Sequence, residues 1–156
     1  MNNRYGFRLK KGDIVDILAP GSFIDEEESL QKGIEILKNW GLEINENNSL
    51  SERFDYFAGS DLTRFGELEK AQNSKLIIFA KGGWGSARIL EKEPSWRNGL
   101  MLGFSDTCSL LLSKYSQGFI GSIHGPMVTG LFKEPEWSLE RLRNLLFEGY
   151  VEDIRG

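Results

Sequence analysis

Short apolar segments that alternate with helix-like segments constrain the fold of this chain more than any other feature of its sequence. Residues 75–80 are the clearest such segment, and they are apolar on both faces, which is typical of a central strand in a parallel sheet. We expect further strands at 13–19, 42–44, 100–103 and 118–123, and helices at 25–40, 61–73, 86–90, 107–115 and 138–147. The alternation predicts an α/β fold with helices on both faces of an open, mainly parallel sheet.

The length and composition of the chain favour one domain of ordinary globular character. Its 156 residues, of which 40% are hydrophobic and 27% charged, fit a single domain that covers residues 1–156. The net charge of -4 and the absence of a basic stripe argue against nucleic acid as a partner. No apolar run has the length of a membrane span, and residues 1–11 do not resemble a secretory signal, so we expect a cytoplasmic protein with no membrane partner.

Cysteine and histidine are too scarce to build a disulfide framework or a metal site. Cys108 is the single cysteine, which excludes an internal disulfide, and its apolar surroundings predict a small core residue. His124 is the single histidine, and its place beside Gly125 and Pro126 favours a structural role. Without a cluster of histidine and cysteine we expect no bound metal and no cofactor.

The loops that follow the predicted strands are the expected place for a functional site, because ligands of open α/β sheets bind at the carboxyl ends of the strands. Four of these loops carry informative residues: 20–22, 81–85, 103–106 and 124–127. Asp61 and Arg64 lie three residues apart on a predicted helix, and we interpret them as a surface ion pair outside this site.

Ser105 lies in a tight turn between a predicted strand and a predicted helix, and Asp106 follows it directly. One interpretation is that Ser105 caps the helix, because serine and aspartate are common caps. The other is that Ser105 is a nucleophile, since the free N–H groups at a helix start stabilise negative charge that develops nearby. This stretch alone leaves both interpretations open.

The loop Lys81-Gly82-Gly83-Trp84-Gly85 has the glycine content of an anion-binding loop. Glycines after a strand allow backbone N–H groups to face a phosphate or a tetrahedral oxyanion. The spacing matches neither a Walker A loop nor the dinucleotide-binding glycine pattern, so an oxyanion is favoured over a nucleotide. Trp84 is either a wall of the pocket or an aromatic residue that covers the core, and the sequence leaves both open.

Taken together, these motifs resemble those of the LD-carboxypeptidases, a family of serine peptidases that includes murein tetrapeptide carboxypeptidases and microcin immunity peptidases. The resemblance covers nearly the whole chain, and the order and spacing of the motifs carry it. The matching residues are 15–20, Ala58-Gly59-Ser60-Asp61 with Arg64, 81–88, Gly103-Phe104-Ser105-Asp106 and His124-Gly125-Pro126-Met127. Lys81 departs from the pattern, because the family usually has arginine there.

The resemblance implies a flavodoxin-like fold of the class I glutamine amidotransferase type. It implies that Ser105 is the catalytic nucleophile and that the backbone N–H groups of Gly83 and Asp106 form the oxyanion hole. Trp84, as a possible wall of that pocket, is the candidate substrate-binding residue. The implied substrate is a peptide with an L-to-D linkage near its C-terminus, such as a muropeptide of bacterial cell-wall recycling. The implied reaction is hydrolysis of that linkage.

The length of the chain departs from the family. Members are about twice as long, and their general-base histidine and supporting glutamate lie in a C-terminal domain that this sequence lacks. The sequence therefore predicts the nucleophile-bearing domain alone, as an excised domain, a split gene product or an inactive descendant, with very slow or no activity by itself. The alternative function is a non-catalytic binding or assembly domain. We also expect exposed apolar side chains at 127–132, which self-association into a homo-oligomer would cover.

Overall fold

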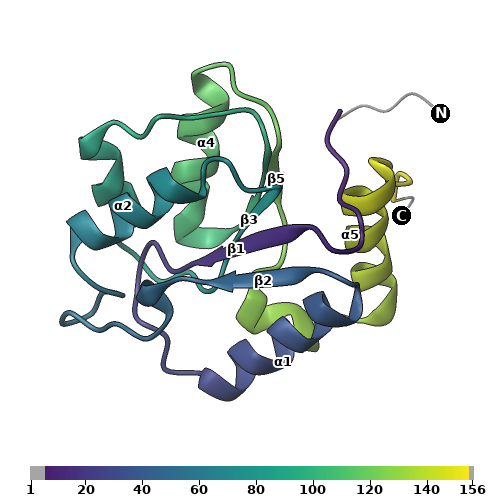
Figure 1. Cartoon of the computed structure of the whole chain (residues 1–156), viewed down its shortest axis with the longest axis horizontal. Helices are drawn as coiled ribbons and strands as arrows, with labels where there is room; N and C mark the ends of the chain where they lie inside the picture. Colours follow the sequence, from purple (N-terminus) through teal and green to yellow (C-terminus); the bar gives the residue numbers. More distant parts are fainter. Residues whose placement is uncertain (1–5, 155–156) are drawn as a thin grey trace.

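Five parallel strands form the centre of the fold in the computed structural model, which describes residues 6–154 (Figure 1). The strands are β1 (Ile14–Leu18), β2 (Glu43–Glu46), β3 (Leu76–Phe79), β4 (Leu100–Gly103) and β5 (Ser122–His124). Their order in the sheet is β2-β1-β3-β4-β5, and every neighbouring pair is parallel. This is the strand order of flavodoxin-like sheets. The α/β fold predicted from the sequence is confirmed.

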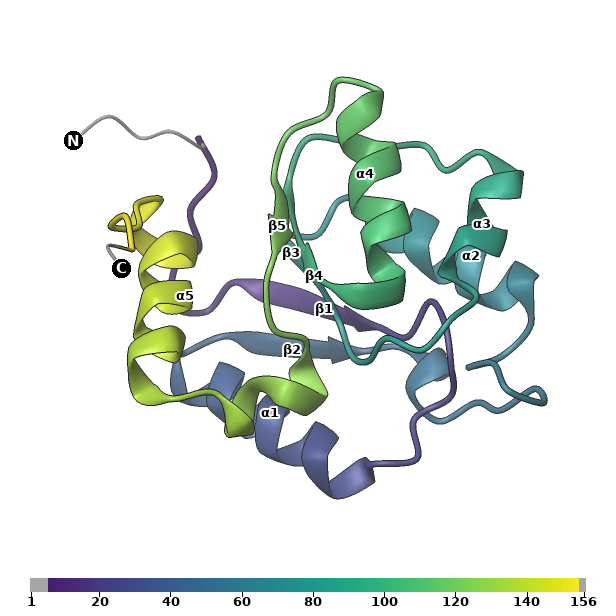
Figure 2. The same ribbon diagram turned by 180° about the vertical axis from the view of Figure 1, so that it is seen from behind.

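Helices cover both faces of the sheet (Figures 1 and 2). One face carries α1 (Glu27–Asn39), α5 (Glu136–Glu148) and the 3-10 segment η4 (Val128–Lys133). The other face carries α2 (Asp61–Ala71), α3 (Ser86–Ile89) and α4 (Cys108–Ser116). The described part of the chain also contains the short 3-10 turns η1 (Asn48–Leu50), η2 (Leu90–Lys92) and η3 (Ser105–Thr107).

The alternating side chains of β3 contribute to both halves of the core, because successive residues of a strand point to opposite faces. Leu76 and Ile78 belong to the hydrophobic cluster that contains residues of α1 and α5. Ile77 and Phe79 belong to the cluster that contains residues of α2 and α4. A strand that is buried on both faces needs a continuous apolar sequence, which is why residues 75–80 gave the clearest strand signal.

The segment after β5 packs closely against α1. A Cβ atom on Gly33 would lie 2.0 Å from the carbonyl oxygen of Val128, so glycine is required for this approach. Met127, Val128 and Leu131 are buried, and Phe132 is the one exposed large apolar residue of residues 127–132. The prediction of an exposed apolar patch here is wrong, because α1 covers the segment. An exposed patch therefore no longer supports self-association, which stays a prediction.

Smaller differences concern the ends of elements. β2 continues to Glu46, beyond the predicted residues 42–44, because pairing with β1 extends an edge strand whose own sequence signal is weak. β5 begins at Ser122, later than the predicted strand at 118–123. Cys108 is half-buried at the start of α4 rather than fully enclosed in the core.

Candidate active site

Ser105 follows the carboxyl end of β4 in a backbone conformation that residues with a side chain seldom adopt. Its φ angle is +61°, in the left-handed region, where the Cβ atom costs roughly 1–2 kcal/mol. Ser105 is exposed and begins η3, directly before α4. Strained strand-to-helix turns of this kind hold the exposed serine nucleophiles of α/β-hydrolases. The tight turn predicted from the sequence is present.

Close packing fixes the backbone on both sides of Ser105. A Cβ atom on Gly103 would lie 2.4 Å from Thr107 Oγ1 and 2.6 Å from a ring carbon of Phe79, so a larger residue does not fit there. The hydroxyl of Thr107 donates to the carbonyl oxygen of Phe104 at 2.8 Å. These contacts impose the conformation of the turn, which is the condition under which backbone strain persists.

The hydroxyl of Ser105 does not cap a helix. Phe104 occupies the N-cap position of η3 and Thr107 that of α4, and neither helix start has a side-chain capping bond. Within residues 6–154 the Ser105 hydroxyl has no hydrogen-bond partner. The capping interpretation is therefore wrong, and the hydroxyl is free to meet a ligand.

Asp106 connects the Ser105 turn to the start of α3. Its carboxylate accepts the backbone N–H of Ser86 at 2.9 Å, and its carbonyl oxygen accepts the hydroxyls of Ser86 at 2.7 Å and Ser109 at 2.9 Å. The backbone N–H of Asp106 has no acceptor among the residues that the structure describes. It is available to an anion, which the oxyanion-hole prediction requires.

The glycine loop after β3 lies against Ser105. A Cβ atom on Gly82 would lie 3.3 Å from both Cβ and Oγ of Ser105. Gly83 has a φ angle of +105°, and a Cβ atom there would lie 2.4 Å from Ser22 Oγ. Its N–H, like that of Asp106, has no acceptor in the described part of the chain. The structure thus brings Ser105 together with both segments that the sequence assigned to the oxyanion hole.

Trp84 belongs to an exposed aromatic cluster beside the glycine loop. Its ring stacks on Tyr56, with centroids 5.2 Å apart and an interplanar angle of 26°, and it meets Phe57 edge-on at 5.2 Å. Trp84 is 56% exposed, so it is not enclosed in the core. The Tyr56 hydroxyl also reaches the loop, because it lies 2.8 Å from the Cβ position of Gly83. A substrate-binding role for Trp84 stays a prediction.

Arg64 is buried beneath the site, where the sequence predicted a surface ion pair with Asp61. Its guanidinium donates to the carbonyl oxygens of Pro20 and Gly85 and to the carboxylate of Asp61. Pro20 follows β1 and Gly85 precedes α3, so one side chain connects two loops at the carboxyl end of the sheet. The surface interpretation is wrong, because residue spacing shows that two side chains share a helix face but not what covers that face.

Hydrogen bonds and burial shift several pKa values around the site. The hydrogen bond from Arg88 lowers the pKa of Asp61, and burial lowers the pKa of Arg64. Burial also acts to lower the pKa of Lys81, but its hydrogen bond to Asp25 and the charges of Asp25 and Glu26 outweigh burial, so the pKa rises. Lys81 therefore keeps the positive charge that arginine would supply at this position.

His124 is the last residue of β5, the strand next to β4, and it is exposed. Its ring meets that of Phe104, with centroids 6.1 Å apart, and within residues 6–154 no hydrogen bond joins it to Ser105.

Residues 6–154 contain no group of three or more histidine, cysteine, aspartate or glutamate side chains that would hold a metal ion. No helix in this part of the chain has both the length and the apolar character needed to cross a bilayer.

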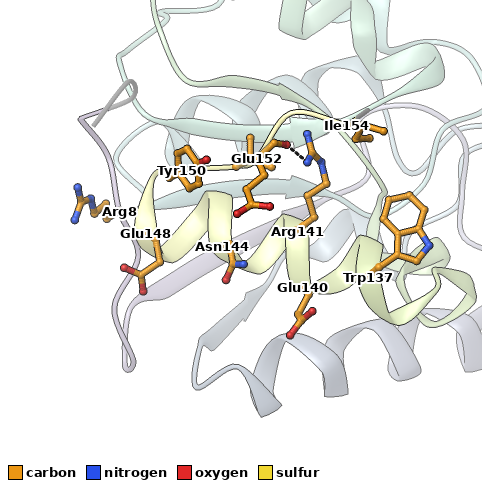
Figure 3. A pocket seen from close by; sticks show the side chains of 10 residues that line it. Arg8, Trp137, Glu140, Arg141, Asn144, Glu148, Tyr150, Glu152 and Ile154 are labelled. Atoms are coloured by element: carbon orange, nitrogen blue, oxygen red, sulfur yellow. Dashed lines mark hydrogen bonds between the residues drawn. The ribbon is translucent and has the colours of Figure 1, made fainter. Parts of the chain in front are cut away.

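A cavity of about 830 Å³ lies on α5 and the segment after it (Figure 3). Trp137, Arg141 and Tyr150 are among the residues that line it, and the guanidinium of Arg141 donates to the carbonyl oxygen of Glu152. In Figures 1 and 2 the arrowheads of β1 and β2 point away from α5. The cavity therefore lies toward the amino ends of the strands, separate from the candidate active site at their carboxyl ends.

Ser22, Tyr56 and Ser86 contact the site, although the sequence had assigned none of them a role there. Ser22 lies in the loop at 20–22, which was flagged only by its position after a strand. Contacts between loops that follow different strands depend on the order of the strands in the sheet. No local pattern encodes that order, so the sequence did not show that these three residues meet at the site.

The model of the LD-carboxypeptidase N-terminal domain matches residues 15–125 of this chain. The matched range contains the glycine loop, the Ser105 turn and Arg64. The chain belongs to the LD-carboxypeptidase N-terminal domain family. The resemblance that the motifs indicated is therefore confirmed.

Curated relatives of this LD-carboxypeptidase domain extend well beyond the matched part. A Synechocystis sp. protein, whose name assigns it only provisionally as a carboxypeptidase, is 39% identical over 148 residues, which are 88% of this chain and 48% of the relative. The murein tetrapeptide carboxypeptidase of Pseudomonas aeruginosa is 29% identical over 145 residues, which are 84% of this chain and 46% of that relative. The chain thus spans about half the length of these relatives.

A solved structure supports the same fold for the LD-carboxypeptidase domain. The microcin C7 self-immunity protein MccF, in its wild-type apo state, matches with a TM-score of 0.78 at 19% identity. The match covers 92% of this chain and 47% of that chain. At this level of identity the likeness concerns the fold alone.

Proposed function

We propose that this chain is the nucleophile-bearing part of a serine LD-carboxypeptidase, with Ser105 as the nucleophile. The observation that carries the proposal is the Ser105 turn, in which an exposed serine with a φ angle of +61° contacts the glycine loop. Strain at an exposed residue is typical of functional positions, because nothing in the stability of the fold favours it. Membership of the LD-carboxypeptidase N-terminal domain family supports the same assignment.

In the proposed reaction the Ser105 hydroxyl attacks the carbonyl carbon of the terminal peptide bond of the substrate. The backbone N–H groups of Gly83 and Asp106 stabilise the oxyanion that forms. A base takes the hydroxyl proton and returns it to the leaving amine, and water then releases the acyl group from Ser105. Trp84 borders the bound peptide, since its exposed ring lies directly after Gly83.

The base is proposed to come from the half of the relatives that lies outside this sequence. The single histidine, His124, has no hydrogen bond to Ser105 within residues 6–154. We propose that a histidine and a glutamate of the second half complete the site. Without them the chain retains only the rate that oxyanion stabilisation and binding supply, so it is very slow or inactive by itself.

The proposed substrate is a muropeptide-like peptide that ends in an L-to-D bond, hydrolysed in the cytoplasm during cell-wall recycling. The name of the Pseudomonas aeruginosa relative, a murein tetrapeptide carboxypeptidase, supports this substrate class. Trp84 and Tyr56 offer apolar surface next to the glycine loop, which suits the flank of a peptide.

Complementation in trans tests the proposal. The 156-residue chain is combined with the C-terminal half of the Synechocystis relative, and release of terminal D-alanine from a muropeptide tetrapeptide is measured. We expect release only when both parts are present, and we expect Ser105→Ala to abolish it. Ser116→Ala, at the exposed end of α4, is the matched control and should keep full activity. Absence of release from two parts that demonstrably associate would contradict the proposal.

A non-catalytic binding or assembly domain is the second candidate, and the lack of a hydrogen bond between His124 and Ser105 within residues 6–154 favours it. In that case Ser105→Ala would keep every cellular function of the chain. Self-association into a homo-oligomer is a separate proposal, which light scattering at high protein concentration tests. A strictly monomeric profile would count against it.

A further inference from the structure

The hydroxyl of Ser22 holds one peptide group of the glycine loop. Ser22 Oγ donates to the carbonyl oxygen of Gly82 at 2.8 Å. That carbonyl belongs to the same peptide group as the N–H of Gly83. Because the group is planar and trans, its C=O and N–H point in opposite directions. Fixing the Gly82 carbonyl toward Ser22 therefore directs the Gly83 N–H away from Ser22.

This peptide group has little else to determine its orientation. Glycine lies on both sides of it, and Gly83 already adopts a φ angle of +105°, so neither flanking residue has a Cβ atom that would oppose rotation of the group. In the described part of the chain the Gly83 N–H has no acceptor. Within the described residues, the hydrogen bond from Ser22 is thus the polar contact that holds the peptide group in this orientation rather than the flipped one.

Ser22 is itself held in place. It is buried, and it forms an isolated antiparallel bridge with Phe57. The neighbouring backbone is tied on both sides, since Ala58 N–H donates to Gly21 at 3.1 Å and Phe23 N–H donates to Tyr56 at 3.0 Å. The donor therefore comes from a segment that its own backbone hydrogen bonds hold in place.

We propose that Ser22 is a positioning residue that orients the Gly82–Gly83 peptide group so that the Gly83 N–H faces the oxyanion formed on Ser105. This inference rests on the proposed function. Gly82 contacts Ser105, since its Cβ position lies 3.3 Å from Ser105 Oγ, so the oriented peptide group begins beside the nucleophile. A hydrogen bond accepted by the carbonyl also polarises the peptide group and makes its N–H a stronger donor.

The first experiment measures the peptide group in the 156-residue chain itself. Ser22→Ala removes the donor, and Ser22→Cys replaces it with a weak S–H donor of similar size. The matched control is Ser74→Ala, because Ser74 also donates to strand carbonyls, those of Ile14 and Leu76, but at the amino ends of the strands. The readouts are the carbonyl ¹³C shift of Gly82, the amide shifts of Gly83 and the crystallographic orientation of the group, with thermal unfolding as the check of folding.

We expect Ser22→Ala to move the Gly82 and Gly83 signals and to leave the peptide group rotated or in two orientations, Ser22→Cys to have a smaller effect, and Ser74→Ala to have none. Unchanged signals and orientation in a folded Ser22→Ala chain would overturn the inference. This readout needs no activity, so its result does not depend on whether the proposed function is correct.

The second experiment uses the complemented pair of chains. Loss of one oxyanion donor lowers kcat roughly 100- to 1000-fold. Because Ser22 only orients that donor, we expect Ser22→Ala to lower kcat about tenfold with KM changed less than about twofold. A raised KM with unchanged kcat would overturn the positioning role. If the wild-type pair shows no activity, the proposed function fails, and the spectroscopic result alone decides the role of Ser22.

Discussion

Replacing Arg64 by methionine removes the side chain that connects two loops of the candidate site. Arg64 is one of the largest fully buried side chains, and it donates to the carbonyl oxygens of Pro20 and Gly85. Methionine fills a similar apolar volume but has no donor. The Pro20 carbonyl would then be without a partner among the described residues, whereas the Gly85 carbonyl would still accept the backbone N–H of Arg88 at 3.1 Å. The change therefore tests whether this connection stabilises the fold.

The size of the effect follows from the contacts. An orphaned buried carbonyl costs about 1–3 kcal/mol, and one is created, that of Pro20. The Asp61 carboxylate loses less stabilisation than the Pro20 carbonyl, because Arg88 still donates to it at 2.7 Å. Some cost is also relieved, since the Nε of Arg64 has no partner within the described residues and its burial is unfavourable. We expect Arg64→Met to lower the free energy of unfolding by about 1–3 kcal/mol.

Arg88→Met is the matched control, because Arg88 contacts the same carboxylate from a half-exposed position. Exposed ion pairs contribute little, so this change should cost no more than about 1 kcal/mol. Arg64→Lys should fall between the two, since lysine keeps the charge but loses the planar fork that reaches two carbonyl groups.

Urea unfolding measures these differences. With a slope of about 2 kcal/mol per M, a loss of about 2 kcal/mol lowers the midpoint by about 1 M. The reasoning would be refuted if Arg64→Met and Arg88→Met shifted the midpoint equally. It would also be refuted if Arg64→Met raised the midpoint, because burial of the Arg64 charge would then destabilise the fold by more than its hydrogen bonds stabilise it.

Further expected outcomes concern two helical glycines and a buried lysine. Gly33→Ala should destabilise the chain by about 1–3 kcal/mol or more, because its Cβ would lie 2.0 Å from the Val128 carbonyl oxygen. Gly66→Ala, in open space on α2, should instead stabilise it by about 1 kcal/mol in the same urea assay. Burial lowers the pKa of Lys114 from 10.5 to about 8, so above pH 8 the unfolded chain binds a proton that the folded chain does not. The free energy of unfolding should therefore rise by about 3 kcal/mol between pH 8 and 10.5. This rise should disappear in Lys114→Met and persist in Lys70→Met, an exposed control; equal profiles would show that Lys114 does not titrate as stated.

The candidate site was predictable from the sequence only in part. The loops at 81–85 and 103–106 were identified because strand, glycine and serine signals are local. Their contact through Gly82 and Ser105 follows from β3 and β4 being neighbours in the sheet. The roles of Ser22 and Arg64 could not be predicted in the same way, because each joins segments far apart along the chain.

The sequence by itself determined the class of the fold and the places where its strands end. Apolar periodicity reports which residues of one segment share a face, and this was enough to predict the parallel sheet and the tight turn at Ser105. Tertiary structure decided whether Asp61 and Arg64 lie at the surface, whether residues 127–132 are exposed and which hydroxyl meets Gly82. Each of these depends on which segment from elsewhere in the chain packs against these residues, and a local sequence pattern does not encode that neighbour.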